Sequence, residues 1–271
     1  MPPPAHPHRL LCHNRRVTYS RYVALGDSFT EGVGDPDPSR PNGLRGWADR
    51  VAEILAADNP DFGYANLAVR GRKLAAILGE QLDHAVQLAP DLVTLSGGAN
   101  DILRPRADID ALALSLDQAV GRLGSIGATV VLFTLPDTRS NQSFKVVRGR
   151  IALFNEFVRE IADAHGTALV DVWRNHDFDR RVFLDSDRLH LSPYGHTSMA
   201  IDVLTALGLD HELILEAPTV TQMLTRRGQR AEHITWVRTF LLPWIGRRLT
   251  GHSSGDGIEP KRPAIAPLDA V

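Results

Sequence analysis

Short runs of apolar residues alternate with longer amphipathic stretches through the middle of the chain. The short runs are rich in β-branched and aliphatic residues and are bounded by turn-forming residues, which is typical of buried strands. The predicted strands are residues 22–25, 64–69, 92–95, 129–135 and 169–173. The longer stretches predict helices over residues 47–57, 74–88, 109–126 and 146–165. This order of elements predicts an α/β protein.

The first predicted helix has the spacing of a helix with one buried face. Trp47, Val51 and Ile54 recur three or four residues apart, so their side chains share one side of the helix. A final helix is expected after these elements, with Ser192 as its N-cap and Pro193 in its first turn. Strands that alternate with helices form right-handed βαβ units, so we expect a parallel sheet covered on both faces.

The two ends of the chain differ from its middle in composition. Residues 1–18 are rich in Pro, His and Arg and predict a mobile tail. Residues 251–271 contain Ser, Gly, Pro and charged residues and predict a flexible, solvated tail. We therefore expect one domain over residues 19–209, followed by a helical extension over residues 210–250.

Charge and cysteine content narrow the compartment and the partners that we expect. The formal net charge is −2 at pH 7, which gives no support to a nucleic-acid partner. The single cysteine, Cys12, makes no intramolecular disulfide, so an oxidising compartment is not implied. The N-terminus lacks the apolar core of a signal peptide, and no apolar run has the length of a transmembrane helix. The expected location is therefore cytoplasmic.

Chemically useful residues follow several of the predicted strands. Ser28 follows the first strand, Gly71 the second and Asn100 the third. Asp187 and His190 lie in the loop after the fifth strand. The carboxyl ends of parallel strands meet at one edge of the sheet, so we expect these residues to lie close together. A serine hydroxyl becomes a nucleophile when a base oriented by a carboxylate takes its proton, and this set therefore predicts a serine hydrolase.

Four short blocks around these residues resemble those of the SGNH (GDSL) hydrolase family. They occur in the order of that family, as Gly26-Asp27-Ser28, Val69-Arg70-Gly71-Arg72, Gly98-Ala99-Asn100-Asp101 and Asp187-Arg188-Leu189-His190. The resemblance implies a flavodoxin-like three-layer α/β/α fold with a five-stranded parallel sheet. It makes residues 19–209 an SGNH hydrolase catalytic domain. It also implies a small-molecule ester or thioester as substrate, hydrolysed without a metal or a cofactor.

The same resemblance implies a role for each residue. Ser28 would be the nucleophile, His190 the general base, and Asp187 the carboxylate that orients His190. The backbone N–H groups of Ser28 and Gly71 and the side-chain amide of Asn100 would form the oxyanion hole. These roles are chemically reasonable, because a glycine lets a backbone donor approach a substrate closely. One donor aimed at the oxyanion contributes roughly 10²–10³ in rate.

Several alternatives stay open at this point. A thioesterase, a lysophospholipase or a carbohydrate deacetylase would use the same groups, and a non-catalytic binding module would use the same fold. No Gly-x-Gly-x-x-Gly or P-loop motif is present, which disfavours a nucleotide-binding module. A metal site around Asp187 and His190 is disfavoured because no second histidine or cysteine stands at ligand spacing. We expect structural roles for Asp27, Asp101 and His196.

Residues 234–249 combine apolar and basic side chains. Trp236 and Phe240 contribute to an apolar surface and Arg238 adds positive charge, and a segment of this kind is able to lie on a membrane surface. Pro243 interrupts the pattern, so two short helices are expected rather than one. We favour the alternative in which this segment packs on the catalytic domain or forms a dimer contact. The oligomeric state itself is not predicted.

Overall fold

The computed structural model describes residues 18–57, 59–139, 144–216, 234–243, 246 and 253–268. The predicted N-terminal tail lies outside these residues apart from Thr18, and so does much of the predicted extension over residues 210–250. None of the helices in the described part of the chain has the length and apolar character needed to cross a membrane.

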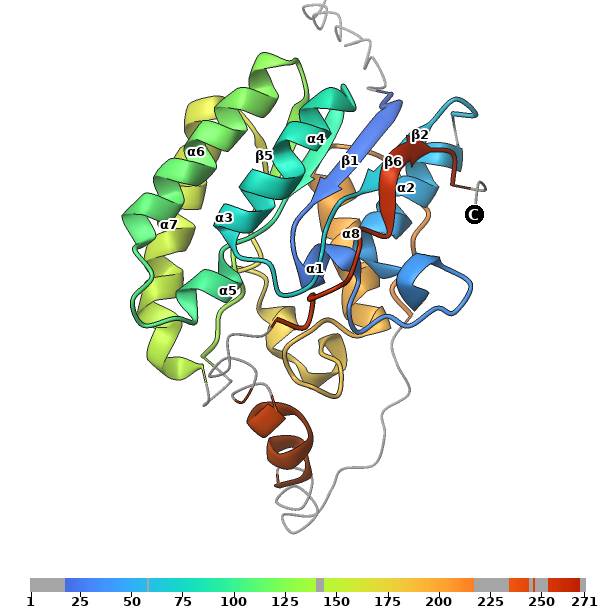
Figure 1. Cartoon of the computed structure of the whole chain (residues 1–271). Helices are drawn as coiled ribbons and strands as arrows, with labels where there is room; N and C mark the ends of the chain where they lie inside the picture. The colour runs from blue at the N-terminus through green and yellow to red at the C-terminus, as the bar shows by residue number, and fades with distance from the viewer. Residues whose placement is uncertain are drawn as a thin grey trace, which may run out of the picture.

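A six-stranded sheet forms the centre of the molecule, with the strand order β5-β4-β3-β1-β2-β6. The first five strands along the chain pair in parallel, as predicted, and β6 pairs antiparallel with β2 (Figure 1). The strands are β1 (Arg21–Leu25), β2 (Gly63–Asn66), β3 (Leu92–Leu95), β4 (Thr129–Phe133), β5 (Ala168–Val170) and β6 (Arg262–Ala266). The prediction of five strands was wrong, because the sheet has a sixth strand, β6, at its edge.

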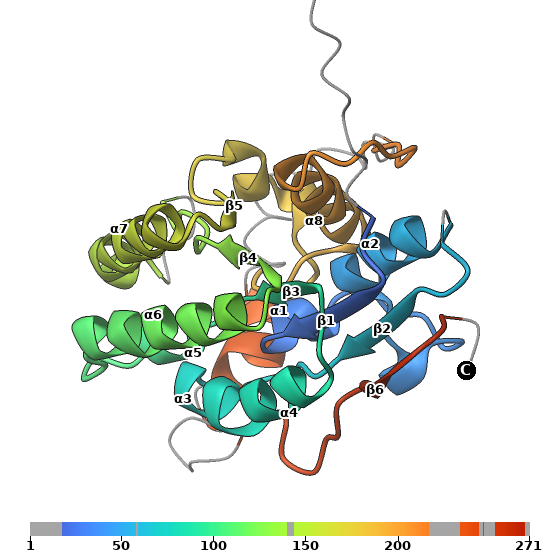
Figure 2. The same cartoon turned by 90° about the horizontal axis from the view of Figure 1, so that it is seen from above.

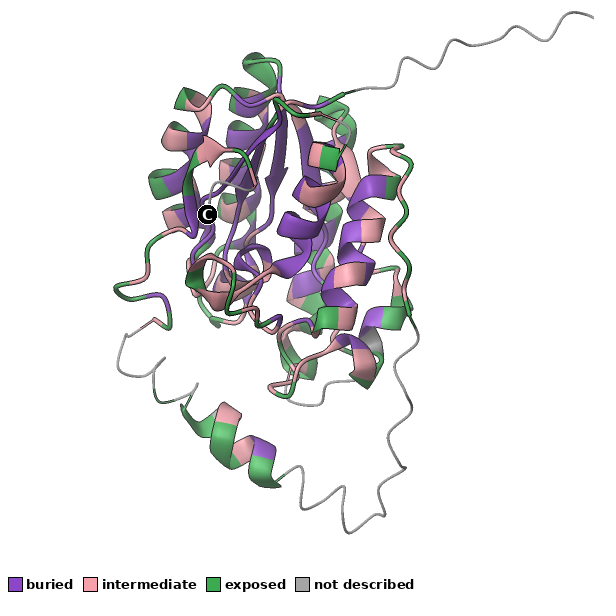
Figure 3. Ribbon diagram, turned by 90° about the vertical axis from the view of Figure 1, so that its right-hand side faces the viewer, coloured by how far each residue is buried: buried purple, intermediate pink, exposed green. Residues whose placement is uncertain are grey.

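Helices cover both faces of the sheet, which confirms the predicted three-layer fold (Figure 2). On one face are α2 (Gly46–Ala57) and α8 (Pro193–Ala206). On the other are α3 (Leu74–Ala76), the π-helix η2 (Ile77–Gln81), α4 (Leu82–Gln87), α6 (Ile109–Ser125) and α7 (Arg148–His165). The strands are buried between these layers (Figure 3), as expected for a parallel sheet that has a separate apolar core on each face.

Short helical segments occupy the loops between these elements. Two of them, α1 (Ser28–Glu31) and α5 (Ala99–Ile102), begin just beyond the carboxyl ends of β1 and β3. The 3₁₀ turns are η1 (Pro41–Gly43), η3 (Lys145–Val147), η4 (His176–Asp179) and η5 (Arg181–Phe183). Residues 234–243 form a further helical segment that contains the π-helix η6 (Val237–Leu241).

The helix predicted over residues 74–88 is divided by the π-helix η2. This π-helix ends at Gln81, whose amide oxygen accepts from the N–H of Gly26 and whose amide nitrogen donates to its C=O, both at 2.9 Å. Gln81 is buried. It therefore fixes the backbone two residues before Ser28, and insertions of this type are frequent at functional sites.

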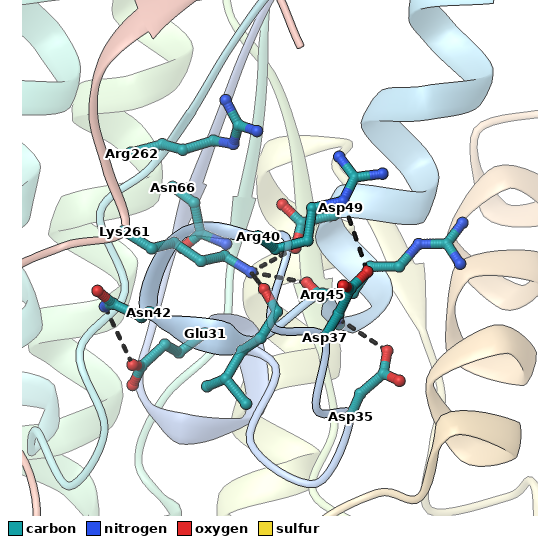
Figure 4. Close-up of polar contacts among 12 residues, drawn as sticks. Glu31, Asp35, Asp37, Arg40, Asn42, Arg45, Asp49, Asn66, Lys261 and Arg262 are labelled. Carbon is teal, nitrogen blue, oxygen red and sulfur yellow. Dashed lines mark hydrogen bonds and ion pairs between the residues drawn. The ribbon is translucent and has the colours of Figure 1, made fainter. Parts of the chain in front are cut away.

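The predicted flexible tail over residues 251–271 is wrong for its central part, because Lys261 holds the start of β6 on the domain. The ammonium group is buried and pairs with the Asp49 carboxylate, and it also donates to the backbone oxygens of Leu44 and Arg45 (Figure 4). Burial opposes both charges, raising the pKa of Asp49 and lowering that of Lys261. The guanidinium of Arg262 lies 5.8 Å from the ring centre of Tyr64 in β2.

Candidate active site

Ser28 is the first residue of α1, directly beyond β1. Asp27 is the N-cap, and its carboxylate accepts from the backbone N–H of Phe29 at 3.1 Å. Gly32 ends the helix in a left-handed conformation. The short helix therefore holds Ser28 at the carboxyl edge of the sheet, where ligands of doubly wound folds bind.

Asp187 and His190 form a hydrogen-bonded pair in the loop that precedes α8. The distance from Asp187 Oδ2 to His190 Nδ1 is 2.5 Å. The other carboxylate oxygen accepts from the backbone N–H groups of Leu189 and His190, both at 2.9 Å. Burial opposes ionisation of Asp187, but the bonds from His190 and the backbone outweigh it and lower the pKa of Asp187 to about 2. The acid is therefore ionised at neutral pH, and the His190 Nδ1 is occupied by it.

A pocket of about 320 Å³ brings the predicted residues together. The five residues that were predicted from separate loops all line it, namely Ser28, Gly71, Asn100, Asp187 and His190. Its volume lies at the lower end of the range for small-molecule sites. Among the residues that the structure describes, no three His, Cys, Asp or Glu side chains stand together as metal ligands do.

Gly71 lies in the loop after β2 with φ at +77°, a conformation that other residues adopt at a cost. A Cβ atom at this position would stand 2.2 Å from the Oγ of Ser253. The neighbouring Gly255 packs against the backbone oxygen of Arg70 in the same way. The C-terminal segment thus passes directly over the loop that contains Gly71, and both glycines permit this close approach.

Asn100 is oriented by two protein acceptors. Its Nδ2 donates to Asp27 Oδ2 at 3.0 Å and to the backbone oxygen of Arg72 at 3.1 Å. Asp27 is almost completely buried, and this burial raises its pKa from 3.8 to about 6 against the opposing effect of the Phe29 N–H. Asp27 therefore links the loop that carries the serine with the loop that carries the amide.

Asp101 and His196 support the site from outside the pocket. Asp101 Oδ2 accepts from the backbone N–H of Leu74 at 2.8 Å, which fixes the start of α3. His196 is buried, its Nδ1 accepts from the Trp47 N–H at 3.1 Å, and its Nε2 donates to the Val33 oxygen at 3.2 Å. Burial lowers the pKa of His196 to about 3, so its ring is neutral. Both residues have the structural roles expected of them.

Four residues from the C-terminal part of the chain complete the pocket and were not predicted from the sequence as part of it. These residues are Trp236, Thr239, Phe240 and Ser254. Trp236 Nε1 donates to the backbone oxygen of Asp187 at 2.7 Å, so this helical segment packs on the domain. Packing of this segment on the catalytic domain, which the sequence favoured together with a dimer contact, is confirmed by this bond, but its position at the pocket was not predicted.

Comparison with known families identifies the chain. A model of the GDSL-like lipase/acylhydrolase family matches residues 24–197, more than half of the chain. The chain belongs to this family. The resemblance seen in the four sequence blocks is thereby confirmed, and membership of an acylhydrolase family supports hydrolysis of an ester bond. The five predicted residues all lie inside the matched region of this GDSL-like protein, whereas the helical segment 234–243 and the strand β6 lie outside it.

Solved structures show the same fold. LAE5, an alpha/beta hydrolase enzyme from the metagenome of Lake Arreo in Spain, aligns with a TM-score of 0.59 and 23% identity, over 73% of this chain and 97% of that one. A catalytic mutant of Axe2, an acetylxylan esterase from Geobacillus stearothermophilus, aligns with a TM-score of 0.59 and 20% identity, over 70% and 95%.

A curated relative matches a shorter stretch. The uncharacterized protein YpmR of Bacillus subtilis (strain 168) is 33% identical over 87 residues, which are 30% of this chain and 32% of that protein. The match thus spans about a third of the length of this relative.

Proposed function

We propose that this protein is a serine esterase that cleaves carboxylic esters through an acyl-Ser28 intermediate. The observation that carries the proposal is the Asp187–His190 pair, held at 2.5 Å, in the same pocket as Ser28. With Nδ1 bonded to the carboxylate, the Nε2 of His190 is the nitrogen that serves as base. This order of nucleophile, imidazole and carboxylate is the one that serine hydrolysis requires.

The reaction proceeds in two acyl transfers. The Oγ of Ser28 attacks the ester carbonyl carbon while His190 takes the hydroxyl proton. The carbonyl oxygen becomes an oxyanion. The oxyanion accepts from the backbone N–H groups of Ser28 and Gly71. The Asn100 amide joins them by exchanging one of its two bonds, to Asp27 or to the backbone oxygen of Arg72, for a bond to the oxyanion. The C–O bond to the alcohol then breaks, and His190 gives its proton to the departing alkoxide.

Water completes the cycle. His190 removes a proton from a water molecule, whose oxygen attacks the acyl-Ser28 carbonyl. Breaking the bond to Ser28 Oγ releases the carboxylic acid, and the serine regains its proton from His190. Asp187 stays ionised throughout, because the pKa of about 2 lies far below neutral pH. It stabilises the imidazolium that forms in each half of the reaction.

The test combines turnover with covalent labelling. Hydrolysis of p-nitrophenyl esters from acetate to palmitate is measured for the wild type, for Ser28→Ala and for Ser125→Ala, a control on the exposed end of α6. We expect Ser28→Ala to lose on the order of 10⁴-fold or more in kcat and Ser125→Ala to retain full activity. A fluorophosphonate probe should add its mass to the peptide that contains Ser28.

A folded Ser28→Ala variant with wild-type turnover would refute the serine mechanism. If the wild type hydrolyses none of these esters, the same variants are assayed with acyl thioesters, lysophospholipids and acetylated sugars, which present the same carbonyl chemistry. Absence of turnover on all of them, together with absence of labelling at Ser28, would favour a binding module on this fold.

A further inference from the structure

One wall of the pocket comes from the C-terminal extension, outside the region that the family model matches. Trp236, Thr239 and Phe240 line the pocket together with Ser28 and His190. We propose that Trp236 and Phe240 select the acyl chain of the substrate, by forming an apolar wall along which an uncharged chain of short or intermediate length lies. The proposal rests on the esterase function given above and names the substrate class of that same site.

Trp236 holds this wall against the catalytic loop. Its indole N–H donates to the backbone oxygen of Asp187 at 2.7 Å, and the guanidinium of Arg188 lies 5.2 Å from the centre of the ring. The Trp236 side chain is 6% exposed, so the segment is seated on the domain at this point. Nε1 is the single polar atom of an indole. Because Asp187 occupies it, the ring offers only carbon atoms to a ligand.

The helical segment directs one face to the pocket. Trp236, Thr239 and Phe240 are three and four residues apart, which places them on the same side of the helix. Ile234 and Leu242 do not line the pocket and are 53% and 55% exposed. The two aromatic side chains are thus separated from Ile234 and Leu242, and the pocket receives a defined pair of rings.

The charge of the pocket favours a neutral ligand. Among the described residues that line the pocket, Arg70 is the only arginine or lysine. The buried carboxylate of Glu31 neutralises its positive charge. Glu31 Oε1 lies 2.5 Å from Arg70 Nη2, and Oε2 accepts from the Arg70 backbone N–H at 2.7 Å. A phosphate or a second carboxylate would have to compete with this ion pair. An uncharged chain makes no such demand.

The volume of the pocket suits a small substrate. At about 320 Å³ it lies at the lower end of the range for small-molecule sites, which favours acyl groups of short or intermediate length such as acetyl, butyryl and octanoyl over a palmitoyl chain. The segment that bears Trp236 and Phe240 is the part of the wall that a longer chain would meet.

The experiment measures kcat/KM for p-nitrophenyl acetate, butyrate, octanoate and palmitate with single variants of the full chain. For Phe240→Ala and Trp236→Ala we expect the ratio of octanoate to acetate activity to fall by about tenfold or more, as for lost apolar contact with a substrate. Trp236→Phe keeps an aromatic ring and should keep the ratio within about threefold, while kcat falls for every ester as the bond to Asp187 is lost. Ile234→Ala, on the exposed side of the same segment, is the matched control.

The outcomes separate this inference from the function on which it rests. If Ser28→Ala abolishes turnover while Trp236→Ala and Phe240→Ala retain the wild-type ratio, the two aromatic residues do not select the acyl chain. The proposed esterase function is then still supported. If Ile234→Ala changes the ratio as much as Phe240→Ala, the effect belongs to folding of the segment and the proposal is overturned. A wild type that prefers palmitate would contradict the proposed preference for short or intermediate chains. If Ser28→Ala retains turnover, the esterase proposal itself has failed.

Discussion

The side-chain amide nitrogen of Asn100 lies 3.0 Å from Oδ2 of Asp27, a carboxyl group that is almost completely buried beside Ser28. The residue before Ser28 thus sets the direction of an amide from a different loop. Because the partner is ionisable and shielded from water, the contact is sensitive to pH. This relationship gives the first of four predictions.

Replacing Asp27 by Asn should remove a pH-dependent loss of stability. Burial raises the pKa of Asp27 from 3.8 to about 6, so between these values the folded state binds more protons than the unfolded state. The free energy of unfolding therefore falls as pH rises through this window. The difference between the two pKa values corresponds to on the order of 3 kcal/mol in the free energy of unfolding. Relative to the wild type, Asp27→Asn should therefore be more stable by this amount above pH 6 than it is near pH 4.

Urea denaturation of the wild type and Asp27→Asn at several pH values from 4 to 8 checks this effect. Asp61→Asn, at an exposed position, serves as the control. Parallel stability curves for the wild type and Asp27→Asn would contradict the raised pKa.

Replacing Asp187 by Asn should lower kcat by on the order of 10⁴-fold, because an amide no longer fixes the tautomer of His190 or stabilises its charged form. The loss should persist at every pH at which the enzyme is folded, since the pKa of Asp187 is about 2. Steady-state kinetics over neutral and alkaline pH give the measurement. Asp185→Asn changes a neighbouring acid that does not line the pocket, and an equal loss in that variant would argue against a specific role for Asp187.

Gly71→Ala should impair both stability and turnover. The left-handed φ of +77° costs a non-glycine residue about 1–2 kcal/mol, and the added Cβ would meet Ser253 Oγ at 2.2 Å. Adding Ser253→Gly to the variant should relieve the contact but not the backbone strain, so recovery is partial. Thermal unfolding and kcat/KM of both variants measure this. Gly149→Ala, in a helix with open space around it, should be neutral or slightly stabilising. Complete recovery in the double variant would show that the backbone conformation costs little.

Lys261→Ala should destabilise the fold by about 3–5 kcal/mol, because it leaves the Asp49 carboxylate buried without a cation. Replacing both residues, by Lys261→Met and Asp49→Leu, should be much less damaging than the single change. Urea denaturation gives the free energies of unfolding. Lys145→Ala, at an exposed position, should have an effect below about 0.5 kcal/mol. If Lys261→Ala is at least as stable as the double variant, the ion pair is not a stabilising contact.

The parallel part of the fold followed from the sequence, because its signals are local. A buried parallel strand is a short apolar run, and the residue after it lies at the carboxyl edge, so Ser28, Gly71 and Asn100 were placed correctly in one pocket. The strand β6 had no such signal. Its partner β2 is distant along the chain, and the burial of Lys261 depends on Asp49 in the helix α2.

The aromatic wall of the pocket was missed for a related reason. The three- and four-residue spacing of Trp236, Thr239 and Phe240 indicates a helix face, but the same spacing suits a membrane surface, a dimer contact or a pocket. The hydrogen bond from Trp236 to the backbone of Asp187 is what places the segment at the pocket. A backbone acceptor has no side-chain identity, and it leaves no mark in the sequence.

The pairing of β2 with β6 imposes an order on folding during synthesis. The five parallel strands and their helices are complete once α8 has left the ribosome, but the outer edge of β2 then still lacks its partner. An open strand edge is a template for pairing with other chains, so the nascent protein is most prone to aggregation in this interval. Arrival of residues 253–266 closes the edge, supplies the cation for Asp49 and brings Ser254 to the pocket in a single step. Protection of the sheet edge and pairing of the Asp49 carboxylate are therefore acquired together, after the parallel strands have been synthesised.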